Sequence, residues 1–168
     1  LEIPYDPALI IRAQSLLLED ADKLSASRPY RFDLVDVQRQ MMTNLGQLIH
    51  RKAAEAFRSK DREAFTLHSG RFLRMLADMD TLLRTRSEYS FDRWLTEARS
   101  WGETKEEKNQ MERDATSLVT IWGADGDPRI FDYSWREWAG LINGYYLPRW
   151  QKFYTMLQQH LDEGTSYE

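Results

Sequence analysis

The sequence predicts an all-α protein in which residues 1–168 form a single domain, a bundle of about six to seven mostly antiparallel helices. Three observations support this fold class. Apolar residues recur at intervals of three and four along most of the chain, and no stretch shows the alternation typical of a strand. The connecting segments are short, which favours antiparallel neighbours. The chain is also long enough to bury a core without disulfides or a metal.

The composition is that of a soluble globular protein, with 42% hydrophobic and 30% charged residues. A formal net charge of −4 disfavours nucleic acid and anionic membranes as partners, because neither would attract the chain electrostatically. Cysteine is absent, and no apolar run approaches the roughly 18 residues that suggest a membrane span. The chain starts at Leu1 rather than at a methionine, so we expect it to be a piece of a longer protein.

The first helix is predicted to begin at Pro7, with Asp6 as its N-cap. Proline suits the first helical position because an N–H there has no partner within the helix, so its absence costs nothing. Apolar residues at helical spacing continue to Leu24, which predicts about five turns. A second helix is predicted over residues 32–57. Its apolar band is wide, as in a helix with neighbours on several sides, and Gly46 within it indicates the close approach of another helix.

A turn at residues 59–61 leads into a third helix that is predicted to end near Thr85. A short fourth helix follows over residues 89–101. Thr104 and Glu107 have the spacing of a capping box, in which each side chain accepts a hydrogen bond from the first turn. They predict the start of a fifth helix.

The fifth helix is predicted to run to Trp122. Residues 123–128 contain two glycines, two aspartates and a proline, and they are the clearest loop in the chain. A sixth helix is predicted to begin after Asp132 or Ser134, and Asp132 would serve as the N-cap for a start at Tyr133. Pro148 is predicted to break or kink the chain before a seventh and last helix.

The histidines do not predict a metal site. His50, His68 and His160 lie on three different predicted helices, without the clustered ligands that a metal needs. Asp125 begins a sequence that hints at a calcium loop, but Arg136 stands where such a loop needs a bidentate glutamate. We therefore expect no metal and no cofactor.

A self-sufficient active site is not predicted either. The chain lacks a thiol, a serine in a nucleophile elbow and a phosphate-binding glycine loop. A glycosidase needs two opposed carboxylates. Asp125 and Asp127 lie on a glycine-rich loop that cannot hold such a geometry alone, and Asp132 is more simply an N-cap. We therefore predict no catalytic residue in this chain.

The aromatic residues concentrate in one stretch. Residues 122–150 contain four of the six tryptophans and three of the eight tyrosines, interleaved with aspartates and arginines. Flat apolar faces beside hydrogen-bonding groups suit a sugar ring. Aromatic residues at helical spacing also form helix cores, so the pattern by itself is compatible with both interpretations.

Within this stretch, Trp122-Gly123, Asp132-Tyr133 and the strings WAGL (138–141) and YYLPRW (145–150) resemble the C-terminal helical domain of the α-N-acetylglucosaminidases, glycoside hydrolase family 89. The string DLVDVxRQ at residues 33–40 and WLxxAR at residues 94–99 extend the resemblance over about residues 5–160.

The resemblance implies a retaining, metal-independent enzyme that removes terminal α-linked N-acetylglucosamine from glycans. In that family a (β/α)₈ barrel carries the two catalytic glutamates, and the helical domain packs against it. This chain lacks the barrel, so the fragment alone is expected to be inactive, with the barrel of the same polypeptide as its partner. A secreted, periplasmic or lysosomal location is implied for the parent.

The resemblance also implies two substrate-binding residues, Trp122 stacking on the sugar and Tyr133 donating a hydrogen bond, in one wall of the pocket. The sequence departs from the family pattern shortly before the Trp-Gly pair. Relatives carry Asn-x-Arg there, whereas residues 114–116 of this chain are Asp-Ala-Thr. Gly140 is expected to allow close helix approach, and Arg149 to pair with a buried carboxylate such as Asp33 or Asp36.

Two other functions are compatible with the residues. A stand-alone helical carbohydrate-binding module would bind saccharide by itself, whereas half of a pocket would bind it weakly. A purely structural interaction domain would bury Trp122 and Tyr133 and have no aromatic cleft.

Overall fold

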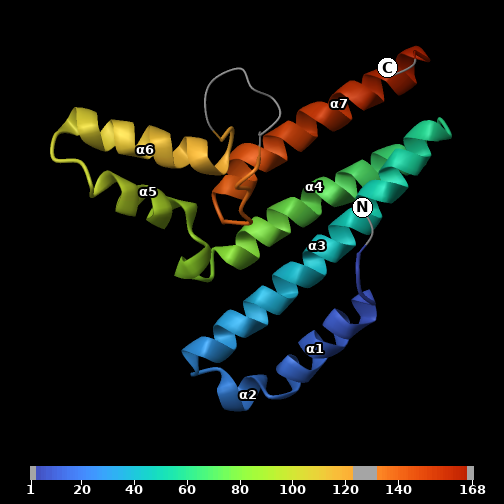
Figure 1. Cartoon of the computed structure of the whole chain (residues 1–168). Coiled ribbons are helices and arrows are strands. Elements are labelled where there is room, and N and C mark those ends of the chain that lie inside the picture. Colours follow the sequence, from blue (N-terminus) through green and yellow to red (C-terminus); the bar gives the residue numbers. More distant parts are fainter. Residues whose placement is uncertain (1–2, 123–131, 166–168) are drawn as a thin grey trace.

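The computed structural model describes residues 3–122 and 132–165 and confirms the all-α fold class (Figure 1). In chain order the helices are α1 (Pro7–Glu19), α2 (Ala21–Leu24), α3 (Arg28–Arg58), α4 (Arg62–Leu83), the 3₁₀ turn η1 (Ser87–Tyr89), α5 (Phe91–Arg99), α6 (Lys105–Val119), the π-helical turn η3 (Ile142–Tyr146) and α7 (Leu147–Glu163). The described residues contain no strand, although Ser90 and Ala139 form an isolated bridge.

Side chains cap the helix starts that the sequence marks. Asp6 and Asp61 accept hydrogen bonds from the first turns of α1 and α4. The capping box of α6 is complete: Thr104 accepts from the backbone N–H of Glu107 at 3.2 Å, and the Glu107 carboxylate accepts from the N–H of Thr104 at 3.0 Å. These local signals are therefore sufficient to place the three starts.

In the first half of the chain, two predicted helix boundaries differ clearly from the structure. The first helix does not run unbroken to Leu24, because Asp20 leaves the helical conformation (φ −102°, ψ 13°) and separates α1 from α2. The second helix begins four residues earlier than the predicted residue 32, at Arg28. Ser27 caps it, and Pro29 lies in its first turn, where the missing N–H costs nothing.

The α3–α4 hairpin is the centre of the fold, and Figure 1 shows its two long helices lying side by side. The turn at residues 59–61 joins them, as predicted. A Cβ atom added at Gly46 would lie 2.6 Å from Cε of Met75 on α4, closer than real side chains approach. Gly46 therefore permits the close helix contact that the sequence indicated.

Helix α7 packs against α4 through aromatic side chains. The ring centroids of Phe72 and Trp150 lie 4.9 Å apart, and those of Phe72 and Tyr154 lie 5.8 Å apart. His50 of α3 reaches the same cluster, with Nδ1 2.8 Å from the hydroxyl of Tyr154. Part of the aromatic-rich stretch is thus core, as one of the two sequence interpretations held.

Helices α5 and α6 form a second hairpin, which extends away from α1 (Figure 1). The indole N–H of Trp94 donates to the carbonyl of Ala115 at 3.0 Å and joins the two helices. The Trp94 ring also contacts Trp138, with centroids 5.6 Å apart. This contact connects the hairpin to the segment that precedes α7.

The predicted sixth helix does not form between Asp132 and Gly140. Gly140 has φ +90°, a conformation that side-chain-bearing residues rarely adopt, and helical backbone resumes only after it. A Cβ atom there would lie 3.5 Å from Cβ of Phe91, an ordinary contact, so backbone conformation rather than close helix approach requires this glycine. Pro148 lies in the first turn of α7, which continues directly from η3, and does not separate two helices.

Candidate functional site

The structure brings the two predicted site residues together. The ring centroids of Trp122 and Tyr133 lie 5.2 Å apart, with their planes inclined by 47°. Two backbone hydrogen bonds hold this arrangement. The N–H of Trp122 donates to the carbonyl of Ser117 at 2.8 Å, and the N–H of Asp132 donates to the carbonyl of Thr120 at 3.0 Å.

Both side chains of the pair are accessible, to different degrees. Tyr133 is 72% exposed, whereas Trp122 is partly buried. An indole face next to an accessible phenol can stack on the apolar face of a ring and exchange a hydrogen bond with it. The pair therefore has the chemistry that a sugar requires, and neither side chain is a buried core anchor.

The backbone at this pair is unusual. Trp122 has φ +47° and Asp132 has φ +60°, in the left-handed region that costs a non-glycine residue roughly 1–2 kcal/mol. Helix α6 ends at Val119 rather than at Trp122, because Thr120 already leaves the helical conformation (φ −122°, ψ −88°). Asp132 is not the predicted N-cap, because no helix follows it. Such strain persists where surrounding contacts determine the conformation.

An ion pair supplies one of these contacts. Nη1 of Arg149 lies 2.8 and 2.7 Å from the two carboxylate oxygens of Asp132. The guanidinium also lies over the ring of Tyr145, 4.9 Å from its centroid. Burial, together with the negative charge of Asp132, raises the pKa of Tyr146 to about 12, so this phenol remains protonated.

The predicted pairing of Arg149 with Asp33 or Asp36 is wrong. Asp36 already accepts hydrogen bonds from Tyr89 at 2.6 Å and from Arg39 at 2.9 Å. Burial acts to raise the pKa of Asp36, but these two hydrogen bonds outweigh it and lower the pKa below its ordinary value of 3.8.

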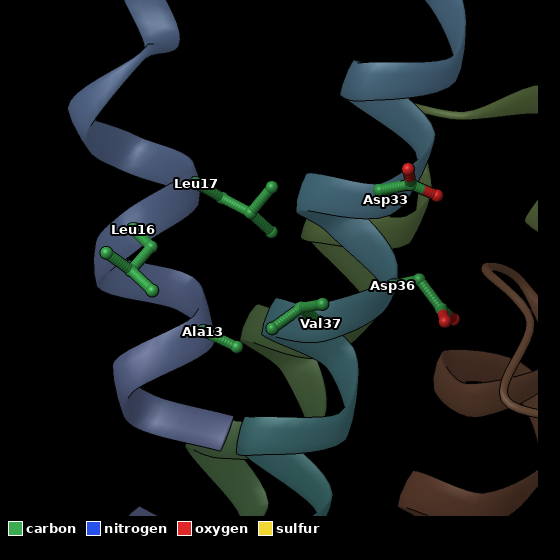
Figure 2. Close-up of a pocket in the computed structure, with 6 residues that line it drawn as sticks. All are labelled: Ala13, Leu16, Leu17, Asp33, Asp36 and Val37. Carbon is green, nitrogen blue, oxygen red and sulfur yellow. The ribbon is translucent and has the colours of Figure 1, made fainter. Parts of the chain in front are cut away.

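Asp33 and Asp36 also border a shallow depression of about 500 Å³ between α1 and α3. Figure 2 shows Leu17 and Val37 facing each other across the two helices, while both carboxylates point away from α1. Neither carboxylate contributes to the pair formed by Trp122 and Tyr133.

Glu137 anchors the irregular segment to α3. One of its carboxylate oxygens accepts from Arg39, and the other accepts from the hydroxyl of Thr43 at 2.6 Å. The side chains of Glu137 and Arg39 are only 13% and 21% exposed, so the pair is largely shielded from water. Glu137 lies 98 positions from Arg39 along the chain, and the sequence analysis did not identify it.

Asp80 anchors the other end of the same segment. Its side chain is 5% exposed and accepts from the backbone N–H groups of Gly140 at 2.7 Å and Asn143 at 3.2 Å, and from Arg84 at 2.7 Å. These bonds satisfy N–H groups at the start of η3. No local pattern identifies this residue, because Gly140 is 60 positions away.

A groove of about 860 Å³ lies beside this site, between the α3–α4 hairpin and η3 with the start of α7. Its lining is mostly apolar and includes Phe72, Met75, Met79, Ile142, Trp150 and Phe153. Asp132 and Arg149 also line it, so the ion pair belongs both to the groove and to the contacts of the aromatic pair. We call it the α4–α7 groove.

The part of the chain that the structure describes contains no metal site and no membrane-spanning helix. Among the described residues, no group of three histidine, cysteine, aspartate or glutamate side chains could hold a metal ion. Within residues 3–122 and 132–165, no helix has the length and apolarity needed to cross a membrane. Asp125 and Asp127 of the predicted loop lie outside the described residues.

Comparison with known proteins identifies the family. Residues 1–168 match the family described as the α-N-acetylglucosaminidase (NAGLU) C-terminal domain. The chain belongs to this family. The match confirms the resemblance that the motifs of the aromatic-rich stretch indicated. It extends over the whole chain, including the parts that carry none of these motifs.

Individual relatives agree with this assignment. The human enzyme is 31% identical over 166 residues, which cover 98% of this chain and 22% of that protein. A family 89 glycoside hydrolase from Clostridium perfringens in complex with 2-acetamido-1,2-dideoxynojirimycin superimposes with a TM-score of 0.92 at 29% identity, covering 98% of this chain and 19% of that chain. A doubly substituted form of the C. perfringens enzyme, in complex with its substrate GlcNAc-α-1,4-galactose, gives the same TM-score and identity. The chain thus spans about a fifth of the length of these relatives.

Proposed function

We propose that residues 1–168 act as one domain of an α-N-acetylglucosaminidase. In this proposal the domain packs against the catalytic barrel of the same polypeptide and forms one wall of the pocket for terminal α-linked N-acetylglucosamine. Family membership supports the assignment to this enzyme class. The complex of the similar C. perfringens enzyme with GlcNAc-α-1,4-galactose supports the choice of substrate.

The contact between Trp122 and Tyr133 is the observation that carries the pocket-wall proposal. The two rings meet 5.2 Å apart, and Tyr133 remains 72% exposed, although a free aromatic side chain would gain from burial. The backbone hydrogen bonds of Trp122 and Asp132 and the ion pair with Arg149 hold this geometry against the strain of two positive φ angles. An exposed aromatic pair held in this way is suited to a ligand.

Each residue has a separate role in the proposal. Trp122 stacks on the apolar face of the sugar, and the hydroxyl of Tyr133 exchanges a hydrogen bond with a sugar substituent. Neither residue transfers a proton to the glycosidic bond. That chemistry needs a pair of carboxylates flanking the bond, which the barrel would supply, so we expect the isolated 168-residue chain to be inactive.

The test is the kcat/KM of the full parent enzyme on an aryl α-N-acetylglucosaminide. Trp122→Ala is expected to lower kcat/KM at least tenfold, or about 1.4 kcal/mol of transition-state binding. Tyr133→Phe removes the hydroxyl alone and is expected to lower it less.

Trp101→Ala is the matched control, because Trp101 is 84% exposed and has no assigned role. Its kcat/KM is expected to equal that of the wild type. Equal kinetics for Trp122→Ala and Trp101→Ala, with the melting temperature maintained, would contradict the pocket-wall role.

A further inference from the structure

The α4–α7 groove has the chemistry of a docking site. Its deep lining belongs to the core, since Phe72, Met79 and Ile142 are at most 7% exposed. Two other lining side chains, those of Leu76 and Trp150, are only partly buried. The groove therefore leaves apolar surface uncovered, which an apolar partner would remove from water.

The polar groups of the groove restrict the partner further. Nδ1 of His50 already interacts with Tyr154, Thr43 donates to Glu137, and Asp132 pairs with Arg149. By contrast, two buried groups of the lining have no hydrogen-bond partner among the described residues, the side-chain carbonyl oxygen of Gln47 and the hydroxyl of Tyr146. A buried acceptor of this kind is costly unless a donor reaches it.

These features fit a polypeptide segment better than a small polar ligand. A segment of a protein offers apolar side chains for the floor and a backbone N–H for Gln47. A saccharide would lose the hydration of many hydroxyl groups on a floor that offers few partners. An anion or a cation would find the charges of Asp132 and Arg149 already paired.

The comparisons point to the source of such a segment. About four fifths of each relative lies outside the part that matches this chain, which covers 22% of the human enzyme and 19% of a C. perfringens enzyme. The groove also shares Asp132 and Arg149 with the contacts that hold the segment of Tyr133. A partner seated in the groove would thus lie next to the aromatic pair.

We propose that the α4–α7 groove seats an apolar segment of the catalytic portion of the parent polypeptide. The segment inserts a side chain between α4 and α7 and donates a backbone N–H to Gln47, whose buried amide turns toward the groove to accept it. This inference rests on the proposed function, because it assigns the surface through which the domain and the catalytic portion meet.

Labelling of single thiols tests the proposal, since the chain itself contains no cysteine. Leu76→Cys places a thiol in the groove. Leu67→Cys places one on the same helix at a position that is 45% exposed, nine residues or about two and a half turns away and thus on the opposite face of α4. The rate of maleimide labelling is measured by mass spectrometry of the labelled peptide, in the 168-residue chain and in the full parent enzyme.

The proposal predicts that the Leu76→Cys thiol is labelled at least tenfold more slowly in the parent than in the isolated chain, while Leu67→Cys changes by less than twofold. Equal rates for Leu76→Cys in the two forms would overturn it. Labelling that slows as the isolated chain is concentrated would also overturn it, because a second copy would then be the occupant.

Amide hydrogen exchange on the unsubstituted proteins provides a second measurement. Peptides from α4 and from the start of α7 should exchange more slowly in the parent, and an unchanged rate would contradict the groove. The kinetics of Trp122→Ala separate this inference from the proposed function. If Trp122→Ala loses activity while the Leu76→Cys thiol is not protected in the parent, the groove proposal alone is rejected. If Trp122→Ala keeps its activity while the thiol is protected, the pocket-wall proposal alone is rejected.

Discussion

The core and the site segment of this domain are held together by different forces. Helices α3, α4 and α7 meet through buried apolar side chains such as Phe65 and Leu83, which are 1% and 0% exposed. The irregular segment between α6 and η3 depends on directed polar contacts. Glu137 binds Arg39, Asp132 binds Arg149, and the third anchor is the buried carboxylate of Asp80.

The difference follows from what each region must specify. Apolar burial is non-directional and suits helices, whose backbone groups are already paired. The site segment contains residues with positive φ, at Trp122, Asp132 and Gly140, and burial alone does not select such conformations. Hydrogen bonds and ion pairs depend on geometry, so they can hold a backbone that its own preferences disfavour.

The largest effect is expected in the core. Phe65→Ala removes a buried ring that contacts Phe57 and Tyr154, each with centroids 5.9 Å away. The lost burial and the cavity should lower the free energy of unfolding by about 3–5 kcal/mol, as measured by urea denaturation. Leu67→Ala, at a position that is 45% exposed, should change it by less than about 0.5 kcal/mol. Similar losses for the two variants would mean that burial does not dominate here.

A smaller effect is expected from the directed contacts. Glu137→Gln keeps an acceptor for Thr43 but removes the charge that faces Arg39, whose guanidinium is 21% exposed. The free energy of unfolding should fall by roughly 1–2 kcal/mol. Amide exchange in the segment after Asp132 should accelerate more than exchange in α3.

Glu97→Gln is the control for this variant, because Glu97 pairs with Arg93 at a surface where both side chains are more than half exposed. Exposed pairs contribute little, so no measurable change is expected. If Glu137→Gln were equally silent, Glu137 could not be an anchor of the segment.

The smallest effect concerns pH. Burial, aided by the positive charge of Arg58, lowers the pKa of His50 below its ordinary value of 6.5. At pH values between 6.5, the pKa of His50 in the unfolded chain, and its lower pKa in the folded state, the unfolded chain binds a proton that the folded chain does not. Stability should therefore fall as the pH decreases below 6.5, and the loss should be complete once the pH has passed the folded pKa.

Urea denaturation of the wild type and of His50→Gln, at a series of pH values between about 7.5 and 5, measures this dependence. The substitution should make the decline shallower, because it removes the titrating group. An identical pH dependence in the two proteins would show that His50 does not contribute to it.

Much of the fold could be predicted from local patterns. The N-caps at Asp6 and Thr104 act within their own first turns, so the sequence places these helix starts well. Gly46 could be assigned to a close helix contact because a glycine inside an apolar band has few other uses. The errors lie at helix ends, such as the start of α3 that Ser27 caps locally, and after Asp132, where distant contacts override local preference.

The sequence by itself determined the all-α class, most of the helices and, through the motifs of the aromatic-rich stretch, the family and the two site candidates. Only the tertiary structure decided that Trp122 and Tyr133 touch, that Arg149 selects Asp132, and that Glu137 anchors the segment. The physical reason is distance along the chain. Glu137 and Arg39 are 98 positions apart, and an ion pair between them leaves no periodic or spacing signal in a single sequence.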